Sequence, residues 1–325
     1  MSPHFEDYVI YSLEGNIIII ASKYGKVGEP SEKIFDIPEL AMELKYIGII
    51  NQQDILLRKL GSKKIFDPLF NSYDIVANSD YFPVLDLGAV RARYLHLSAA
   101  ELQRLRVFAA PLLETLDGQP IRTTPLSINE NYYLQIGVTA RRAMRIHQYF
   151  EGVKKNQVTP SQSMSEMTVA TIRNIRTIHH LQCQQISNEK WFVFEAEKGW
   201  LPSLHFLAKV TLPYLSPTEM KIVWADLEAA PCFTHLPENI RHWFNLYKAV
   251  GNRDFKQVLQ FSKLLLPKEE IKPSEENNYL LTVLMLAHIT QKNYDAAFAL
   301  LERYSLRAAP PIEIRLLGAI AKQQL

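Results

Sequence analysis

The chain has 325 residues, of which 47% are hydrophobic and 22% are charged, and its formal net charge is +2. This composition excludes a disordered or fibrous protein, and the length predicts two or three packed units. The small net charge excludes a strongly basic nucleic-acid-binding protein and gives no electrostatic reason to expect an anionic membrane as partner.

The chain opens with a predicted β-hairpin. Residues 5–12 and 16–22 have the composition of strands, and Gly15 and Asn16 suit the tight turn between them. The second strand, NIIIIAS, is apolar throughout, as is typical of a strand covered on both faces. Because two strands do not make a stable sheet, we expect further partner strands that this pattern does not contain.

Two short helices follow the hairpin. Residues 37–47 are predicted to be capped by Asp36, and residues 52–60 to be capped by Asn51 and closed by Gly61. Residues 66–95 are rich in turn formers and contain one extended run, 82–87. The sequence therefore predicts an α/β segment over residues 1–95.

The remainder is predicted to be helical. Residues 131–152 have helical spacing, and residues 191–214 are ambiguous between strand and helix, with helix favoured. Polar connections are expected at 115–130 and 154–162. Three capping boxes, each a serine followed three residues later by a glutamate, open further helices: Ser98 with Glu101, Ser163 with Glu166, and Ser216 with Glu219.

Residues 242–267 and 281–304 resemble a diverged pair of tetratricopeptide units. Phe255 and Tyr294 occupy equivalent positions 39 residues apart, compared with roughly 34 in the usual repeat. An insertion around residues 272–278 would account for the difference. Stacked helix pairs can present a concave groove to a protein partner, or they can simply pack as a core, and the sequence leaves both open.

The segment NSDYFPVLDLGAVRARYL, residues 78–95, resembles the closing motif of spermidine-synthase-like (polyamine aminopropyltransferase-like) proteins, especially those fused to membrane domains. Val90 follows Ala89 where that family usually has proline. The residues that match the motif are Asn78, Ser79, Asp80, Pro83, Asp86 and Arg91.

The resemblance implies that residues 1–95 form the end of a methyltransferase-like Rossmann sheet. The family transfers an aminopropyl group from decarboxylated S-adenosylmethionine to an amine such as putrescine. Its glycine-rich loop and acidic strand ends would lie upstream, and the chain has no GxG, GxGxxG or P-loop. No catalytic residue and no cofactor-binding residue is therefore assigned. Asn78, Asp80 and Asp86 are the candidate substrate-side residues, with turn capping as the structural alternative.

Other candidate sites are weaker. Aromatic side chains could line an aliphatic amine's path or form core: Tyr46, Tyr73, Tyr81 and Phe82. Two histidine pairs lack the spacing of a metal site: His179 with His180, and His235 with His242. A basic group is expected to be a solvated helix face: Arg141, Arg142, Arg145, Lys154, Lys155, Arg173 and Arg176. Cys183 and Cys232 are predicted to be two buried thiols in a reducing compartment.

These patterns predict a mainly α protein with three regions: an α/β part at 1–95, a helical part at 96–235 and tetratricopeptide-like helices at 236–325. The preferred function is a C-terminal fragment of a spermidine-synthase-like protein without transferase activity of its own. The alternative is a helical-repeat module that binds a protein. No cofactor, metal or nucleic acid is expected. No segment approaches the ~20 apolar residues of a membrane span, and no secretory signal is visible, so we expect a cytoplasmic chain whose parent could be membrane-associated.

Overall fold

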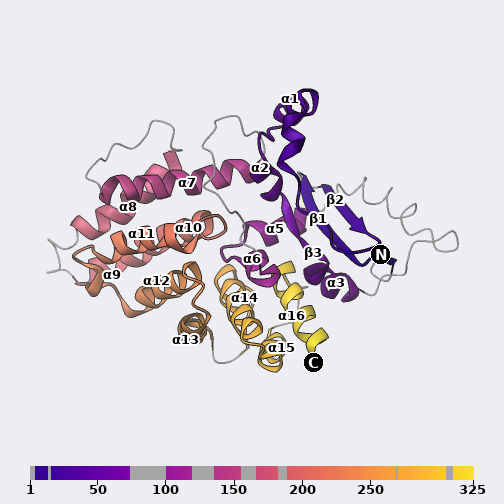
Figure 1. Ribbon diagram of the computed structural model, residues 1–325. Helices are drawn as coiled ribbons and strands as arrows, with labels where there is room; N and C mark the ends of the chain where they lie inside the picture. The colour runs from indigo at the N-terminus through magenta and orange to yellow at the C-terminus, as the bar shows by residue number, and fades with distance from the viewer. Residues whose placement is uncertain are drawn as a thin grey trace, which may run out of the picture.

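The computed structural model describes residues 4–13, 16–73, 100–118, 135–154, 166–181, 189–267, 270–304 and 310–325. Within these ranges the chain is mainly helical, with a small antiparallel sheet near the N-terminus (Figure 1). The prediction of a mainly α protein that begins with strands is confirmed at this level.

The sheet has three strands. Strands β1 (Asp7–Leu13) and β2 (Asn16–Ser22) form the predicted hairpin, with Val9 opposite Ile20. A third strand, β3 (Lys59–Ser62), pairs antiparallel with the other side of β1, so the strand order is β2-β1-β3. Strand β3 is thus one of the expected partner strands, and the sequence pattern did not reveal it.

The prediction of a helix over residues 52–60 is wrong beyond its first turn. Helix α2 (Gln52–Leu56) is capped by the Asn51 side chain, as predicted, but ends before β3 begins. Gly61 does not close a helix; it lies in β3 with a φ of 149°, a conformation that residues with a side chain rarely adopt. Pairing with β1 and full burial of Leu60 therefore prevail over the local helical signal.

Strand β2 is not covered on both faces, contrary to the expectation from its composition. Ile17 and Ile19 pack against the core, whereas Ile18 and Ile20 remain 49% and 47% exposed. Their neighbours on β1, Tyr11 and Val9, are buried. The outer face of the sheet is thus covered over the central strand and open over the edge strand.

The other helices near the sheet differ in burial. Helix α1 (Pro38–Tyr46) is preceded by the short 3-10 helix η2 (Glu32–Asp36) and has no buried residue; it projects from the body in Figure 1. The predicted cap by Asp36 is wrong, because Ile37 is the N-cap and contributes no side-chain hydrogen bond. Helix α3 (Lys63–Asn71), which the sequence pattern did not predict, packs its apolar side against the core.

The middle of the chain is helical, as predicted. The Ser216–Glu219 capping box is formed, as predicted. Ser98 and Ser163 lie outside the described residues. The elements are α5 (Ala100–Val107), α6 (Leu112–Asp117), α7 (Gln135–Lys154), α8 (Glu166–Leu181), α9 (Glu189–Glu195), the π-helical turn η4 (Ala196–Trp200), α10 (Leu201–Thr211), α11 (Pro217–Glu228) and η5 (Phe233–His235).

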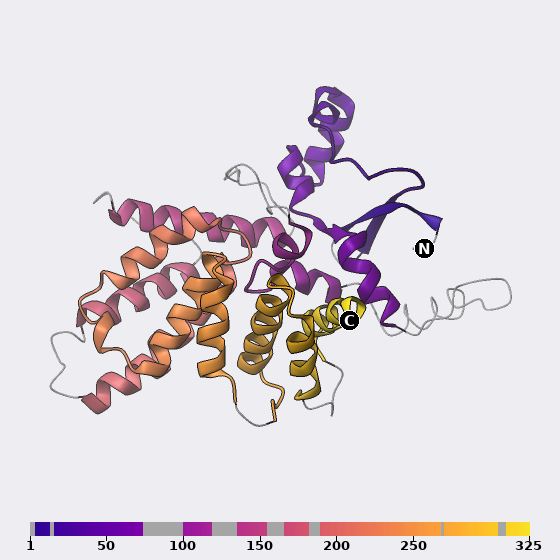
Figure 2. The ribbon, with the colours of Figure 1, turned by 60° about the horizontal axis from the view of Figure 1, so that its bottom comes forward.

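Five helices form a stack at the C-terminus, each packed against the next (Figure 2). They are α12 (Glu238–Gly251), α13 (Phe255–Leu265), α14 (Glu275–Thr290), α15 (Tyr294–Glu302) and α16 (Ile312–Gln324). Phe255 and Tyr294 begin the second helix of each pair, as the predicted alignment requires. The connection between the two pairs is residues 266–274, so the predicted insertion at 272–278 falls partly inside α14.

The last helix of the stack packs against the N-terminal part of the chain. Helix α16 packs on α3 and α5, and the guanidinium carbon of Arg315 lies 4.9 Å from the centre of the Tyr73 ring. The buried carboxylate of Glu313 forms an ion pair with Arg104, with 3.3 Å between Oε1 and the arginine Nε. The N-terminal and C-terminal parts of the described chain therefore contribute to one hydrophobic core (Figure 2).

Candidate functional site

The substrate-side residues suggested by the family resemblance, Asn78, Asp80 and Asp86, lie outside the described residues. Of the four aromatic residues considered for an amine path, Tyr81 and Phe82 lie there too. Tyr46 is 85% exposed at the end of α1, so it is not a core residue. Tyr73 is half-buried beneath Arg315.

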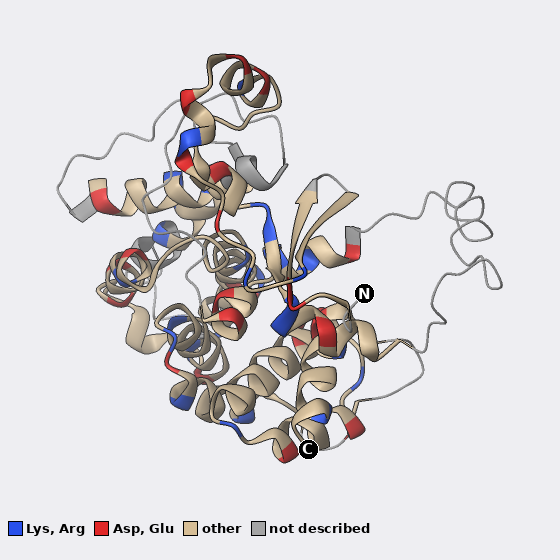
Figure 3. Ribbon diagram, turned by 45° about the vertical axis from the view of Figure 1, so that its right-hand side comes forward, with Lys and Arg blue, Asp and Glu red and all other residues tan. Residues whose placement is uncertain are grey.

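Two of the candidate histidine and basic residues form ion pairs with nearby carboxylates. His242 lies 3.6 Å from Glu238, one helical turn earlier. Arg176 pairs with Asp226 at 2.9 Å, and Arg173 is exposed on α8. Within the described ranges, no group of three or more His, Cys, Asp or Glu side chains could hold a metal ion. Charged residues of both signs are interspersed over the elements (Figure 3).

Cys232 is buried and disulfide-bonded. The expectation of two free thiols is therefore wrong; the other cysteine of the chain, Cys183, lies outside the described residues. Spacing alone could not reveal this bond, because a disulfide depends on the fold bringing two distant residues together. Disulfides are rare in reducing compartments, so the bond counts against the predicted cytoplasmic location.

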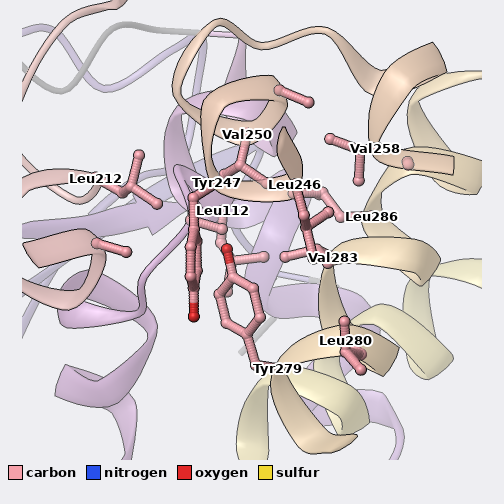
Figure 4. Close-up of a cluster of buried hydrophobic side chains, with 14 of the residues drawn as sticks. Leu112, Leu212, Leu246, Tyr247, Val250, Val258, Tyr279, Leu280, Val283 and Leu286 are labelled. Atoms are coloured by element: carbon pink, nitrogen blue, oxygen red, sulfur yellow. The ribbon is translucent and has the colours of Figure 1, made fainter. Parts of the chain in front are cut away.

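The inner face of the helix stack is filled by the chain itself. Helix α14 is buried at every position from 279 to 289. The ring of Tyr279 stacks on Phe108, with 5.6 Å between centroids, and its hydroxyl donates to the carbonyl of Ala109 at 3.0 Å. Figure 4 shows Leu112 of α6 in the same cluster. The face that would be a concave groove in an open repeat is thus occupied by the segment from α5 to α6.

Polar and aromatic groups meet where α10, α12 and α14 converge; we call this the junction, and it comprises His205, Trp243, Tyr247 and Tyr279. His205 Nδ1 and the Tyr247 hydroxyl share a hydrogen bond of 2.7 Å. The His205 ring also meets Trp243 edge-on at 4.8 Å. Tyr247 and Tyr279 lie next to each other, with 5.2 Å between ring centroids (Figure 4).

The surroundings of the junction fix its protonation. Burial lowers the pKa of His205, and the carboxylates of Glu276 and Glu275 offset this in part. Burial, followed by the same two carboxylates, raises the pKa of Tyr247. His205 is therefore expected to be neutral and Tyr247 to keep its proton at neutral pH. The arrangement is an internally satisfied hydrogen-bonded pair under an aromatic cover.

Stability is expected to fall on acidification because of His205. Its folded pKa lies below its unfolded value of about 6.5, so the unfolded chain binds more protons in the window below pH 6.5. The stabilisation is complete above that window and is lost as the pH falls through it. Urea unfolding at pH 7.5, 6.0 and 5.0 should show this decline, and His205→Gln should make it shallower.

His288 contributes in the same direction, since burial lowers its pKa as well, so a residual slope is expected in the His205→Gln variant. His235→Gln, a change at an exposed position that leaves the His205 contacts intact, is the control. An unchanged slope in His205→Gln would show that the histidine is not held neutral by the junction.

The sequence contained part of the signal for this junction. Trp243 and Tyr247 are four residues apart and therefore share one face of α12. His205 and Tyr279 come from distant helices, and no local pattern connects them to that face. The prediction that residues 191–214 are helical, which places His205 on α10, is confirmed.

Comparison with protein-family models, with curated proteins and with solved structures finds no match to this chain. Among the helices that the structure describes, none is both long enough and apolar enough to cross a lipid bilayer.

Proposed function

We propose that this chain is the C-terminal part of a spermidine-synthase-like protein and has no aminopropyltransferase activity of its own. The observation that carries the proposal is the order of the N-terminal elements. An antiparallel hairpin, β1 and β2, comes first, short helices follow, and the motif at 78–95 comes next. In the family that the motif resembles, it follows the last two strands of a methyltransferase-like sheet.

Under this proposal, residues 1–95 are the end of a Rossmann-like sheet, and the nucleoside site lies in a part of the parent protein upstream of the hairpin. Strand β3, which pairs on the far side of β1, would be an addition to that sheet. Asn78, Asp80 and Asp86 would approach the amine substrate only when the catalytic part is present. The cytoplasmic location predicted from the sequence belongs to the same proposal, and it requires the Cys232 disulfide to form in a reducing compartment, where such bonds are rare.

The direct test is an aminopropyltransferase assay on this chain with putrescine and decarboxylated S-adenosylmethionine, beside an active spermidine synthase as positive control. We expect no spermidine to form. Turnover by the chain alone would overturn the proposal. The reading frame upstream supplies a second test, because it should encode a glycine-rich loop and acidic strand ends; a frame without them would also count against family membership.

A second candidate function is protein binding by the helix stack, and the exposure of its outer helices favours it. Because the inner face is filled, a partner would have to contact α13 and α15. Leu264 on α13 is 57% exposed, whereas only Val258 and Ser262 of that helix are buried. Pull-down with the full chain should recover a partner that Leu264→Asp loses and Tyr46→Asp, on the distant helix α1, retains. Equal recovery by both variants would exclude this surface.

A further inference from the structure

The two edges of the sheet differ in how they are closed. At the β3 edge, the backbone N–H and the hydroxyl of Ser62 donate to the Asp117 carboxylate at 3.2 and 2.6 Å. Strand β3 is also only four residues long. In the described part of the chain, no strand pairs with the outer side of β2, which is seven residues long. The β2 edge therefore offers a row of backbone donors and acceptors to another strand.

Strand β2 also lacks the features that usually prevent edge pairing. Natural edge strands carry lysine, proline or a bulge, or they are short. The segment NIIIIAS has no charged residue and no proline, and its register with β1 is regular from Asp7 to Leu13. The half-exposed side chains of Ile18 and Ile20 add an apolar surface beside that edge. An uncharged apolar strand is the partner that this edge fits.

A second copy of β2 meets that requirement. In an antiparallel pair around a two-fold axis, each residue faces its symmetry-related counterpart, so a charged strand would place like charges opposite each other, which is destabilising. Strand β2 carries no charge and avoids this cost. With the axis at Ile19, Ile18 of one copy faces Ile20 of the other, and the core side of both sheets stays on one face.

We propose that the β2 edge is an interaction surface for a second copy of this chain, joined antiparallel around Ile19 into one continuous sheet. The apolar surfaces formed by Ile18 and Ile20 then lie side by side on its outer face. The pairing is a property of the chain alone and does not depend on the proposed function. In a longer parent protein, another strand of that protein would pair with the same edge. The molar mass of this chain therefore tests the dimer alone, and the aminopropyltransferase assay tests the proposed function alone.

The test is the molar mass of the full chain in solution, measured by light scattering across a range of concentrations. We expect a dimer, and we expect the double variant Ile18→Lys/Ile20→Lys to be monomeric because lysines of the two copies would face each other. Both positions are half-exposed, so the variant is expected to fold, which circular dichroism checks. Met42→Lys, at an exposed position on α1, is the matched control and should remain dimeric.

Hydrogen exchange gives an independent measurement. The outward-facing amides of β2 should be more protected at high protein concentration than at low concentration, and this difference should vanish in the double variant. A monomer at every concentration would overturn the proposal, and so would a dimer that the two lysines leave intact.

Discussion

Replacing Tyr279 by alanine is expected to lower the free energy of unfolding by about 3–5 kcal/mol, the usual cost of removing a large buried aromatic ring. The side chain is 7% exposed and touches three other aromatic rings, those of Phe108, Trp243 and Tyr247. It joins the helix stack to the α5–α6 segment, so its loss should weaken the contact between the two parts of the chain. Urea unfolding followed by fluorescence measures the effect.

Two further variants make the result specific. Tyr279→Phe keeps the ring and removes only the hydrogen bond to the Ala109 carbonyl, so a cost of about 1 kcal/mol is expected. Tyr46→Ala removes the same kind of side chain from a position that is 85% exposed and should change stability by no more than about 0.5 kcal/mol. If Tyr279→Ala cost as little as Tyr46→Ala, the inner face of the stack would be open.

This result also decides between two roles for the stack. An open helical repeat keeps its inner face free for a partner, and truncating a side chain there costs little in the absence of that partner. In this chain the same face is covered by α6 and by Phe108 and Ala109 just before it, and α14 is buried at every position from 279 to 289. A large penalty in the isolated chain would therefore mean that the stack supports the fold through its inner face, leaving only the outer helices to bind.

Several C-terminal helices were predictable because their signals lie close together in the sequence. The capping box that opens α11 joins Ser216 to Glu219 within one turn, and Phe255 and Tyr294 each begin a helix at the same position of a repeat unit. Strand β3 was not predictable, since its pairing with β1 joins residues about 50 positions apart and Lys59–Ser62 carries no strand pattern of its own. The Tyr279 contacts were hidden for the same reason.

The exposure of β2 shows a different limit. Composition predicted a strand covered on both faces, and for β1 at the centre of the sheet the burial of Val9 and Tyr11 agrees with such cover. For β2 the covering layer is absent in the described residues, because the strand lies at the edge of the sheet. A run of isoleucines predicts a strand that is buried on both faces, but whether both faces are buried depends on the position of the strand in the sheet.

Glycine substitutions at Arg253 and Lys292 are expected to shift stability in opposite directions. The two residues occupy equivalent turns of the helix stack and share a φ of 57°, in the left-handed region. The next residues, Asp254 and Asn293, cap the helices that follow. A side chain in this conformation costs roughly 1–2 kcal/mol, and glycine relieves that cost at an entropic penalty of roughly 0.5–1 kcal/mol. Lys292→Gly should therefore stabilise the chain by about 0.5–1 kcal/mol.

Arg253 differs from Lys292 because its side chain anchors the turn to the rest of the protein. Its Nε and Nη2 donate to the two carboxylate oxygens of Glu114 on α6, at 3.2 and 2.9 Å, and its Nη1 donates to the carbonyl of Gly251. Both members of the ion pair are largely buried, at 15% and 21% exposure. Losing these charge-assisted bonds should outweigh the backbone relief, so Arg253→Gly is expected to destabilise by about 2 kcal/mol.

Chemical denaturation of the two glycine variants and of Glu114→Gln tests this difference. The double variant Arg253→Gly/Glu114→Gln should cost less than the sum of the two single changes, because each single change already breaks the same ion pair. Additive costs, or a stabilising effect of Arg253→Gly equal to that of Lys292→Gly, would show that the pair does not hold the stack to α6. Since φ is 57° at both residues, any difference between the variants reports the contacts of the Arg253 side chain.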